Sequence, residues 1–174
     1  MKQNIALLTL GCPKNLVDSE VMLKILNDNK KYNIVNDLKG AEIIIINTCA
    51  FIESAKQESI NTIIKIGELK KKKCKKIIAA GCLSERYNKE LLNLMPELDA
   101  VIGTGDYKKI GEIIRKVSRN EKVLLYGNQE SIDIDTLDRI NQNENNMAYL
   151  KIAEGCDNRC TYCAIPFIRA GYRS

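Results

Sequence analysis

The sequence predicts an α/β fold in which helices cover both faces of a parallel β-sheet. Short apolar runs alternate with amphipathic segments over residues 1–126, which is the pattern of successive strand–helix units. One run, residues 43–46, consists of four consecutive isoleucines, and such a β-branched run suits a central strand that is buried on both faces. Glycine follows several of the runs directly, as expected where a strand ends in a loop.

The apolar runs also give the expected strands. We expect five strands in a flavodoxin-like order, at residues 5–10, 32–35, 43–46, 75–81 and 100–102. The short run 32–35 suits the edge of the sheet. Residues 123–126 either add one more strand or begin a linker. The predicted architecture is therefore a three-layer, flavodoxin- or Rossmann-like domain.

Amphipathic segments between these runs predict the helices. In residues 16–26 the apolar side chains share one face, which leaves Asp18, Ser19 and Glu20 on the other face, and Asn15 is the expected N-cap. The next two helices are expected at residues 51–73 and 84–94. A last helix, ending near residue 117, is expected to be capped by Asp106.

The composition excludes several classes of protein. With 45% apolar residues the chain can bury a sizeable core, and no stretch is long and apolar enough to span a membrane. The first residues do not resemble a signal peptide, so we expect a cytoplasmic protein whose seven cysteines are ligands or reactive thiols rather than disulfides. The absence of histidine excludes catalysis by a Cys-His or Ser-His pair.

Three cysteines share one short loop near the end of the sequence. Cys156, Cys160 and Cys163 are spaced by four and three positions. Cysteine thiolates hold zinc or iron–sulfur clusters, and zinc would need a fourth protein ligand in a chain that has no histidine. Three thiolates instead fit a four-iron cluster with one iron left open. The alternatives are a zinc knuckle or a structural group of reduced cysteines.

A second group of cysteines is dispersed in the sequence. Cys12, Cys49 and Cys82 each follow the carboxyl end of an expected strand by one to three residues. Because such ends meet at one edge of a parallel sheet, we expect the three side chains to converge there and to bind a second cluster. Gly11 and Gly81 would let the backbone approach it. The alternative is three small buried hydrophobic residues.

The remaining cysteine lies in a run of lysines. Cys74 follows Lys70, Lys71, Lys72 and Lys73, at an expected helix end rather than at the cysteine edge, and we interpret it as a spare thiol. The lysines suit a solvated helix terminus, where positive charge is favoured by the helix dipole. The alternative is a contact with RNA, which the net charge of +5 permits but does not require.

Several of these stretches resemble the methylthiotransferase family of radical S-adenosylmethionine enzymes. The Cys-x3-Cys-x2-Cys spacing is similar to the radical S-adenosylmethionine signature. Residues 10–20, Leu-Gly-Cys-Pro-Lys-Asn-Leu-Val-Asp-Ser-Glu, resemble the first motif of the family's RimO branch. Further similarity to that branch is found at residues 47–55, 81–84 and 149–156. The tRNA-modifying branches typically have Gly-Cys-Gln-Met-Asn in the first motif.

The resemblance implies a role for six cysteines. A [4Fe-4S] cluster that carries the sulfur group would be bound by Cys12, Cys49 and Cys82. A second [4Fe-4S] cluster, which cleaves S-adenosylmethionine to a radical, would be bound by Cys156, Cys160 and Cys163. The implied reaction is methylthiolation of the β-carbon of an aspartate in a small-subunit ribosomal protein, with an electron donor such as flavodoxin. A tRNA adenosine methylthiotransferase is the nearest alternative.

The resemblance also predicts how the chain is divided. We expect a methylthiotransferase N-terminal domain at residues 1–126, a linker at 127–147, and the start of a truncated radical S-adenosylmethionine (β/α) barrel at 148–174, with a strand over 147–153. Ala170-Gly171 stands where the family usually has Gly-Lys. As an N-terminal fragment, the chain is expected to be inactive alone. Alternatives from other classes are a non-catalytic iron–sulfur binding module and a zinc-stabilised interaction domain.

Overall fold

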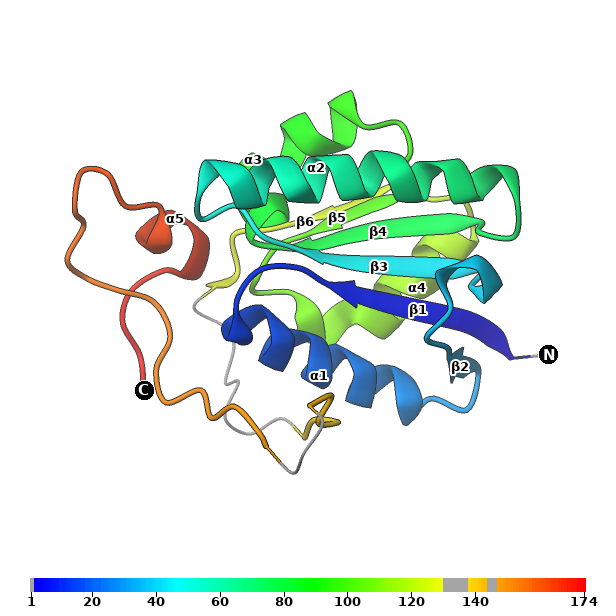
Figure 1. Cartoon of the computed structure of the whole chain (residues 1–174), viewed down its shortest axis with the longest axis horizontal. Helices are drawn as coiled ribbons and strands as arrows, with labels where there is room; N and C mark the ends of the chain where they lie inside the picture. Colours follow the sequence, from blue (N-terminus) through cyan, green and yellow to red (C-terminus); the bar gives the residue numbers. More distant parts are fainter. Residues whose placement is uncertain (1, 130–137, 144–146) are drawn as a thin grey trace.

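The computed structural model describes residues 2–129, 138–143 and 147–174. Within this part of the chain, six parallel strands form one sheet in the order β2-β1-β3-β4-β5-β6 (Figure 1). The first five positions have the flavodoxin-like order that the sequence predicts, and the run near residue 124 adds a sixth strand. The predicted α/β class is confirmed.

The elements have the following bounds. The strands are β1 (Gln3–Thr9), β2 (Tyr32–Ile34), β3 (Ile43–Thr48), β4 (Lys76–Gly81), β5 (Ala100–Ile102) and β6 (Val123–Leu125). The α-helices are α1 (Pro13–Asn27), α2 (Glu53–Gly67), α3 (Cys82–Leu94), α4 (Ile110–Ser118) and α5 (Ile165–Arg169). Short 3-10 helices are η1 (Leu38–Gly40), η2 (Glu68–Lys71) and η3 (Tyr107–Lys109).

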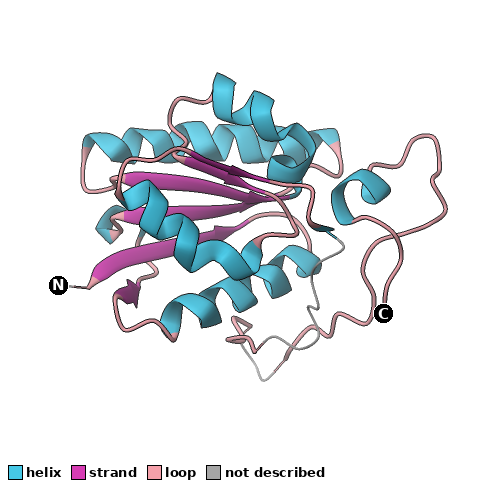
Figure 2. Ribbon diagram, turned by 180° about the vertical axis from the view of Figure 1, so that it is seen from behind, coloured by secondary structure: helices cyan, strands magenta, loops and turns pink. Residues whose placement is uncertain are grey.

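The isoleucine run in β3 shows how the sheet is buried. Ile43 and Ile45 pack in the layer of α1 and α4, whereas Ile44 and Ile46 pack in the layer of α2 and α3. Figure 2 shows these helices on both sides of the sheet. All four isoleucines are at most 1% exposed. Burying four such side chains contributes about 6–12 kcal/mol before chain entropy is subtracted, so this run anchors both cores.

The first helix begins earlier than predicted and is capped differently. It starts at Pro13, which suits a first helical position because proline lacks the N–H that would be unpaired there. The N-cap residue is Cys12, whose side chain makes no capping bond. Asn15 is therefore not the cap. Its Nδ2 donates to the backbone oxygens of Leu10 and Thr48, both at 2.9 Å, and so holds α1 to the ends of β1 and β3.

Other helix boundaries also differ from the prediction. The second helix ends at Gly67 and continues only as the short η2, since glycine disfavours the α-helix. The third begins at Cys82, directly after β4 and two residues earlier than expected. Asp106 makes no capping bond. Its carboxylate accepts instead from Lys109 Nζ at 2.8 Å and from Asn128 Nδ2 at 3.0 Å, and η3 precedes α4.

The strand predicted over residues 147–153 is wrong. The nearest ladder contact in the described residues is an isolated antiparallel bridge between Glu154 and Arg173. A strand needs a neighbour to pair its N–H and C=O groups, and the described chain supplies none beside this segment. Leu150 and Ile152 accordingly remain 81% and 77% exposed. In the part of the chain described, no helix is both long and apolar enough to cross a bilayer.

Replacing Ala170 by glycine is expected to stabilise the segment 147–174. Ala170 has φ 58° and ψ −159°, a region that only glycine adopts without strain. Relief of that strain outweighs the conformational entropy that glycine adds to the unfolded segment, so the segment should gain about 1 kcal/mol of stability. Trypsin should then cleave after Arg169 about fivefold more slowly. Mass spectrometry of limited digests measures it. The control is Ala164→Gly, because Ala164 has an ordinary φ of −87° and should gain nothing; equal protection in both variants would contradict the prediction.

Candidate metal centres

Three of the predicted ligands lie at the carboxyl-terminal edge of the sheet. Cys12, Cys49 and Cys82 follow β1, β3 and β4, which are neighbouring strands. Cys49 and Cys82 are buried, whereas Cys12 is exposed. The topology therefore places all three at one edge, with one thiol open to solvent and two beneath it.

Two glycines shape the loops at this edge. Gly11 and Gly81, which precede Cys12 and Cys82, have φ values of 87° and 92°. A Cβ at Gly11 would lie only 2.6 Å from the Cβ of Cys49, so the loop that carries Cys12 rests directly on Cys49. The glycines permit close contacts between neighbouring loops, and their predicted approach to a cluster stays a prediction.

The Cys82 thiol is buried, with 6% of the residue exposed. Burial raises its pKa to about 11, and the nearby guanidinium of Arg169 offsets this only in part. The Nη2 atom of Arg169 donates to Cys82 Sγ at 3.4 Å, and the thiol lies 3.5 Å from Oδ1 of Asn15. A thiol with this pKa stays protonated at neutral pH until a metal replaces its proton.

The second group of cysteines lines a single cavity. Cys156, Cys160 and Cys163 all border a space of about 480 Å³, which is in the range of small-molecule sites. Cys160 is exposed and the other two are half-buried. The backbone N–H of Cys163 donates to the Cys160 oxygen at 3.0 Å and closes a turn between them. Polar residues on the cavity wall include Asp157 and Arg159.

Each group of cysteines offers three thiols, which is the number of ligands that a four-iron cluster with one open iron would need. In the described ranges, no three Cys, Asp or Glu side chains converge closely enough to hold a single metal ion. In a four-iron cluster each thiolate would bind a different iron, so the three sulfurs need not meet at one point. The number and type of donors therefore suit the cluster that the sequence predicts for each group.

The polar face predicted for α1 is buried rather than solvated. Asp18, Ser19 and Glu20 are each at most 1% exposed. Later segments cover this face: the backbone N–H of Gln142 donates to Glu20 Oε1 at 2.9 Å, and that of Ile140 donates to the Glu20 backbone oxygen at 3.2 Å. The helix is thus covered on two sides, by the sheet and by the chain that leads to the second cysteine loop.

Asp18 is the centre of a buried ionic network that the sequence analysis missed. Its carboxylate pairs with Lys151 at 2.5 Å and with Arg169 at 2.6 Å. Both cations also pair with Glu154, at 2.9 Å and 3.3 Å. All four side chains are at most 5% exposed. The available signal was the presence of charged residues in both cysteine-bearing motifs, Asp18 in the first and Lys151 and Glu154 in the second.

The docking of residues 147–174 is expected to weaken in acid through Glu154. Burial opposes its ionisation, but Arg169 and Lys151 outweigh burial and lower the pKa of Glu154 from 4.5 to about 2. A depressed folded pKa gives stability that is present above pH 4.5 and is lost as the pH falls towards 2, here about 3 kcal/mol. Hydrogen-exchange protection of this segment, corrected for intrinsic rates, measures the loss.

A Glu154→Gln variant is the control for that acid effect. Glutamine keeps the shape of the side chain but cannot ionise, so its protection should start lower at pH 6 and fall less between pH 5 and pH 2. Parallel pH profiles for the variant and the parent chain would show that Glu154 is not the responsible group.

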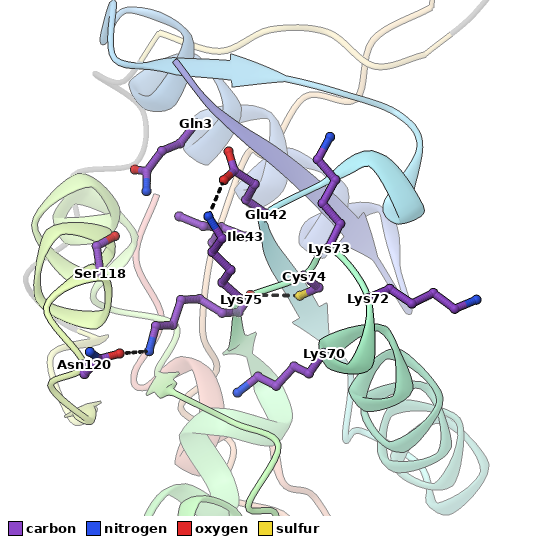
Figure 3. A pocket seen from close by; sticks show the side chains of 11 residues that line it. Gln3, Glu42, Ile43, Lys70, Lys72, Lys73, Cys74, Lys75, Ser118 and Asn120 are labelled. Carbon is purple, nitrogen blue, oxygen red and sulfur yellow. Dashed lines mark hydrogen bonds and ion pairs between the residues drawn. The ribbon is translucent and has the colours of Figure 1, made fainter. Parts of the chain in front are cut away.

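Cys74 and the lysine run lie at the opposite edge of the sheet. Figure 3 shows them around a pocket of about 790 Å³ at the amino ends of the strands. Burial raises the pKa of the Cys74 thiol, which is 3% exposed. Lys75 pairs with Glu42 at 2.8 Å, and Lys70 pairs with Asp99 at 2.6 Å. Cys74 is therefore buried and lies apart from both cysteine sites, and its interpretation as a spare thiol stays a prediction.

The comparisons with known proteins identify the family of the chain. The model of the family described as "Uncharacterized protein family UPF0004" matches residues 4–103. The chain is 56% identical over 172 residues to the "Ribosomal protein uS12 methylthiotransferase RimO" of Thermoanaerobacter sp. (strain X514), covering 99% of this chain and 39% of that protein. The protein of the same name from Clostridioides difficile (strain 630) is 50% identical over 171 residues, 98% of this chain and 38% of that protein.

These relatives match the chain over almost its whole length. The chain in turn spans about two-fifths of theirs, with 39% of the protein from Caldanaerobacter subterraneus subsp. tengcongensis covered at 57% identity. The UPF0004 match takes in the sheet as far as β5 and, within it, Cys12, Cys49 and Cys82. The chain belongs to the RimO-type methylthiotransferase family, whose N-terminal domain the UPF0004 model describes.

Proposed function

We propose that the protein to which this chain belongs methylthiolates a ribosomal protein by radical S-adenosylmethionine chemistry. The observation that carries the proposal is the presence of two separate groups of three thiols, one at the sheet edge and one around a cavity of about 480 Å³. The relatives named as uS12 methylthiotransferases support the substrate class. When bound, two [4Fe-4S] clusters and S-adenosylmethionine would supply the radical and the sulfur group.

The residues of this chain have distinct parts in that proposal. Cys12, Cys49 and Cys82 would hold the cluster that carries sulfur, with two buried thiols and one exposed thiol around it. The second cluster and S-adenosylmethionine would share the cavity between the three loop cysteines and Phe167. The buried network around Asp18 would hold the segment of the second cysteine group against the helix that follows Cys12. In this proposal the network connects the two cluster-binding parts of the chain.

The test of the substrate uses the full-length parent enzyme. Incubated without oxygen with S-adenosylmethionine, a reductant such as flavodoxin and either uS12 or tRNA, it should add a methylthio group to the ribosomal protein. Resemblance to the RimO branch implies the β-carbon of an aspartate as the acceptor. Modification of tRNA instead would support the tRNA adenosine methylthiotransferase alternative.

The isolated chain is proposed to bind clusters without completing the reaction. Its domains would be the sheet domain, residues 1–126, a linker at 127–147 and the start of the radical domain at 148–174. Cleavage of S-adenosylmethionine to 5′-deoxyadenosine by the chain alone would contradict this. Clusters without cleavage would mean that the chain acts only as an iron–sulfur binding module. We further propose that the enzyme works in the cytoplasm.

A second proposed partner is RNA at the lysine-lined pocket. In Figure 3 the ammonium groups of Lys70, Lys72 and Lys73 point in different directions, which suits the spaced phosphates of RNA better than one small anion. Substituting alanine for both Lys72 and Lys73 is expected to reduce the slope of log K against log salt by about 1.5 for a ribosomal RNA fragment. The control changes Lys89 and Lys108, two exposed lysines that do not line this pocket. An equal effect of both double changes would contradict a specific contact.

A further inference from the structure

One side chain connects the two cysteine sites. Arg169 lies six positions after Cys163, yet its guanidinium reaches the other site, where Nη2 donates to Asn15 Oδ1 at 2.6 Å and to Cys82 Sγ at 3.4 Å. Its Nη1 donates to Asp18 Oδ2 at 2.6 Å. Figure 1 shows α5, which ends at Arg169, beside the carboxyl ends of the strands.

The guanidinium is a fixed charge in a dry environment. Arg169 is 4% exposed, and although burial opposes its charge, the pairing with Asp18 outweighs burial and raises its pKa further. A buried cation acts more strongly on its neighbours than a surface cation does, because water does not screen it. Arg169 therefore remains positive at every pH at which the protein is folded.

The network around Arg169 contains two anions, Asp18 and Glu154, and two buried cations, Lys151 and Arg169. Lys14, whose side chain is 48% exposed, also lies 3.5 Å from Glu154. Removing either buried cation lowers the net charge of the network by the same one unit. The two cations differ in one respect: Arg169 contacts Cys82, whereas the hydrogen bonds of Lys151 go to Asp18 and Glu154. Comparing variants of Arg169 and Lys151 therefore separates the effect of a cation beside Cys82 from the effect of the network's total charge.

We propose that Arg169 is a positioning residue that neutralises the Cys82 thiolate of the first cluster and so raises the reduction potential of that cluster. The inference rests on the proposed function, in which Cys82 is a ligand. Three thiolates make a cluster site strongly anionic, and reduction adds a further negative charge. A cation 3.4 Å from one ligand sulfur favours the reduced state. Because Arg169 belongs to the second cysteine segment, docking of that segment would set the potential of the first cluster.

The experiment measures the potential of the first cluster alone. Cys156, Cys160 and Cys163 are changed to alanine in the full 174-residue chain, which is then reconstituted without oxygen and titrated with a reductant while spectra are recorded. In that background Arg169→Met should make one-electron reduction at least about tenfold less favourable, a fall of about 59 mV. Lys151→Met should shift the equilibrium less than about threefold. Arg169→Lys should restore part of the loss.

Each outcome bears on the proposal. A large shift in Arg169→Met with a small shift in Lys151→Met supports it. Loss of the first cluster in Arg169→Met, with the cluster kept in Lys151→Met, would overturn it, because Arg169 would then be needed for assembly rather than for the potential. Equal shifts in both variants, or an unchanged potential in Arg169→Met, would overturn it while leaving the proposed function intact. Failure of the background chain itself to take up iron would overturn the proposed function and this inference together.

Discussion

Replacing Cys49 by alanine is expected to remove the first cluster and leave the second in place. Cys49 follows β3, the central strand of the cysteine edge, and the loop of Cys12 rests on its Cβ. With two thiols left, the site cannot hold a four-iron cluster, so the iron content should fall from about eight to about four atoms per chain. Iron and sulfide analysis after oxygen-free reconstitution gives the result.

A matched variant separates ligation from the loss of any buried cysteine. Cys74 is also buried, at 3% exposed compared with 6% for Cys49, but it lies at the opposite edge of the sheet. Cys74→Ala should therefore retain all the iron. Loss of both clusters in Cys49→Ala would show that the two groups of cysteines do not form separate sites.

Replacing Asp18 by asparagine is expected to release residues 147–174 from the sheet domain. The change keeps the size of the side chain but leaves Lys151 and Arg169 buried with only Glu154 to balance them. Breaking a buried pair in this way typically destabilises by about 3–5 kcal/mol. Hydrogen-exchange protection of the segment should drop more than about 100-fold.

The control for Asp18→Asn lies at the other end of the same helix. Asp28 pairs with Lys24 at 2.8 Å, but its side chain is 57% exposed. Exposed pairs of this kind contribute about 0–1 kcal/mol, so Asp28→Asn should leave the protection nearly unchanged. Similar losses in the two variants would mean that the buried network does not hold the segment.

The sheet could be predicted because its signals are local. The isoleucines of β3 identify a buried parallel strand by themselves, and the positions of Cys12, Cys49 and Cys82 follow once the strand ends are known. The resemblance of the same stretches to one branch of a family is equally local. The class of fold and the shared edge of the three cysteines therefore follow from the sequence, whereas the predicted strand order rests on the likeness to a flavodoxin-like fold and leaves the sixth strand open.

The network around Asp18 could not be predicted because it depends on contacts between distant residues. Asp18 and Arg169 are 151 positions apart, and a helix with polar residues on one face ordinarily exposes that face. Asn15 is a residue type that often caps helices, but in the folded chain its amide donates to two backbone oxygens at the ends of β1 and β3. The strand expected at 147–153 failed for the same kind of reason, since strand formation depends on a neighbour that the local pattern does not reveal.

The most direct test of the account is the iron and acid-labile sulfide content of the unsubstituted 174-residue chain after oxygen-free reconstitution, together with its Mössbauer spectrum. The account predicts about eight irons per chain as two four-iron clusters, each held by three cysteines. About four irons per chain would mean that one of the two groups of cysteines does not bind a cluster. Zinc without iron–sulfur absorbance would contradict the central claim and leave a zinc-stabilised interaction domain in its place.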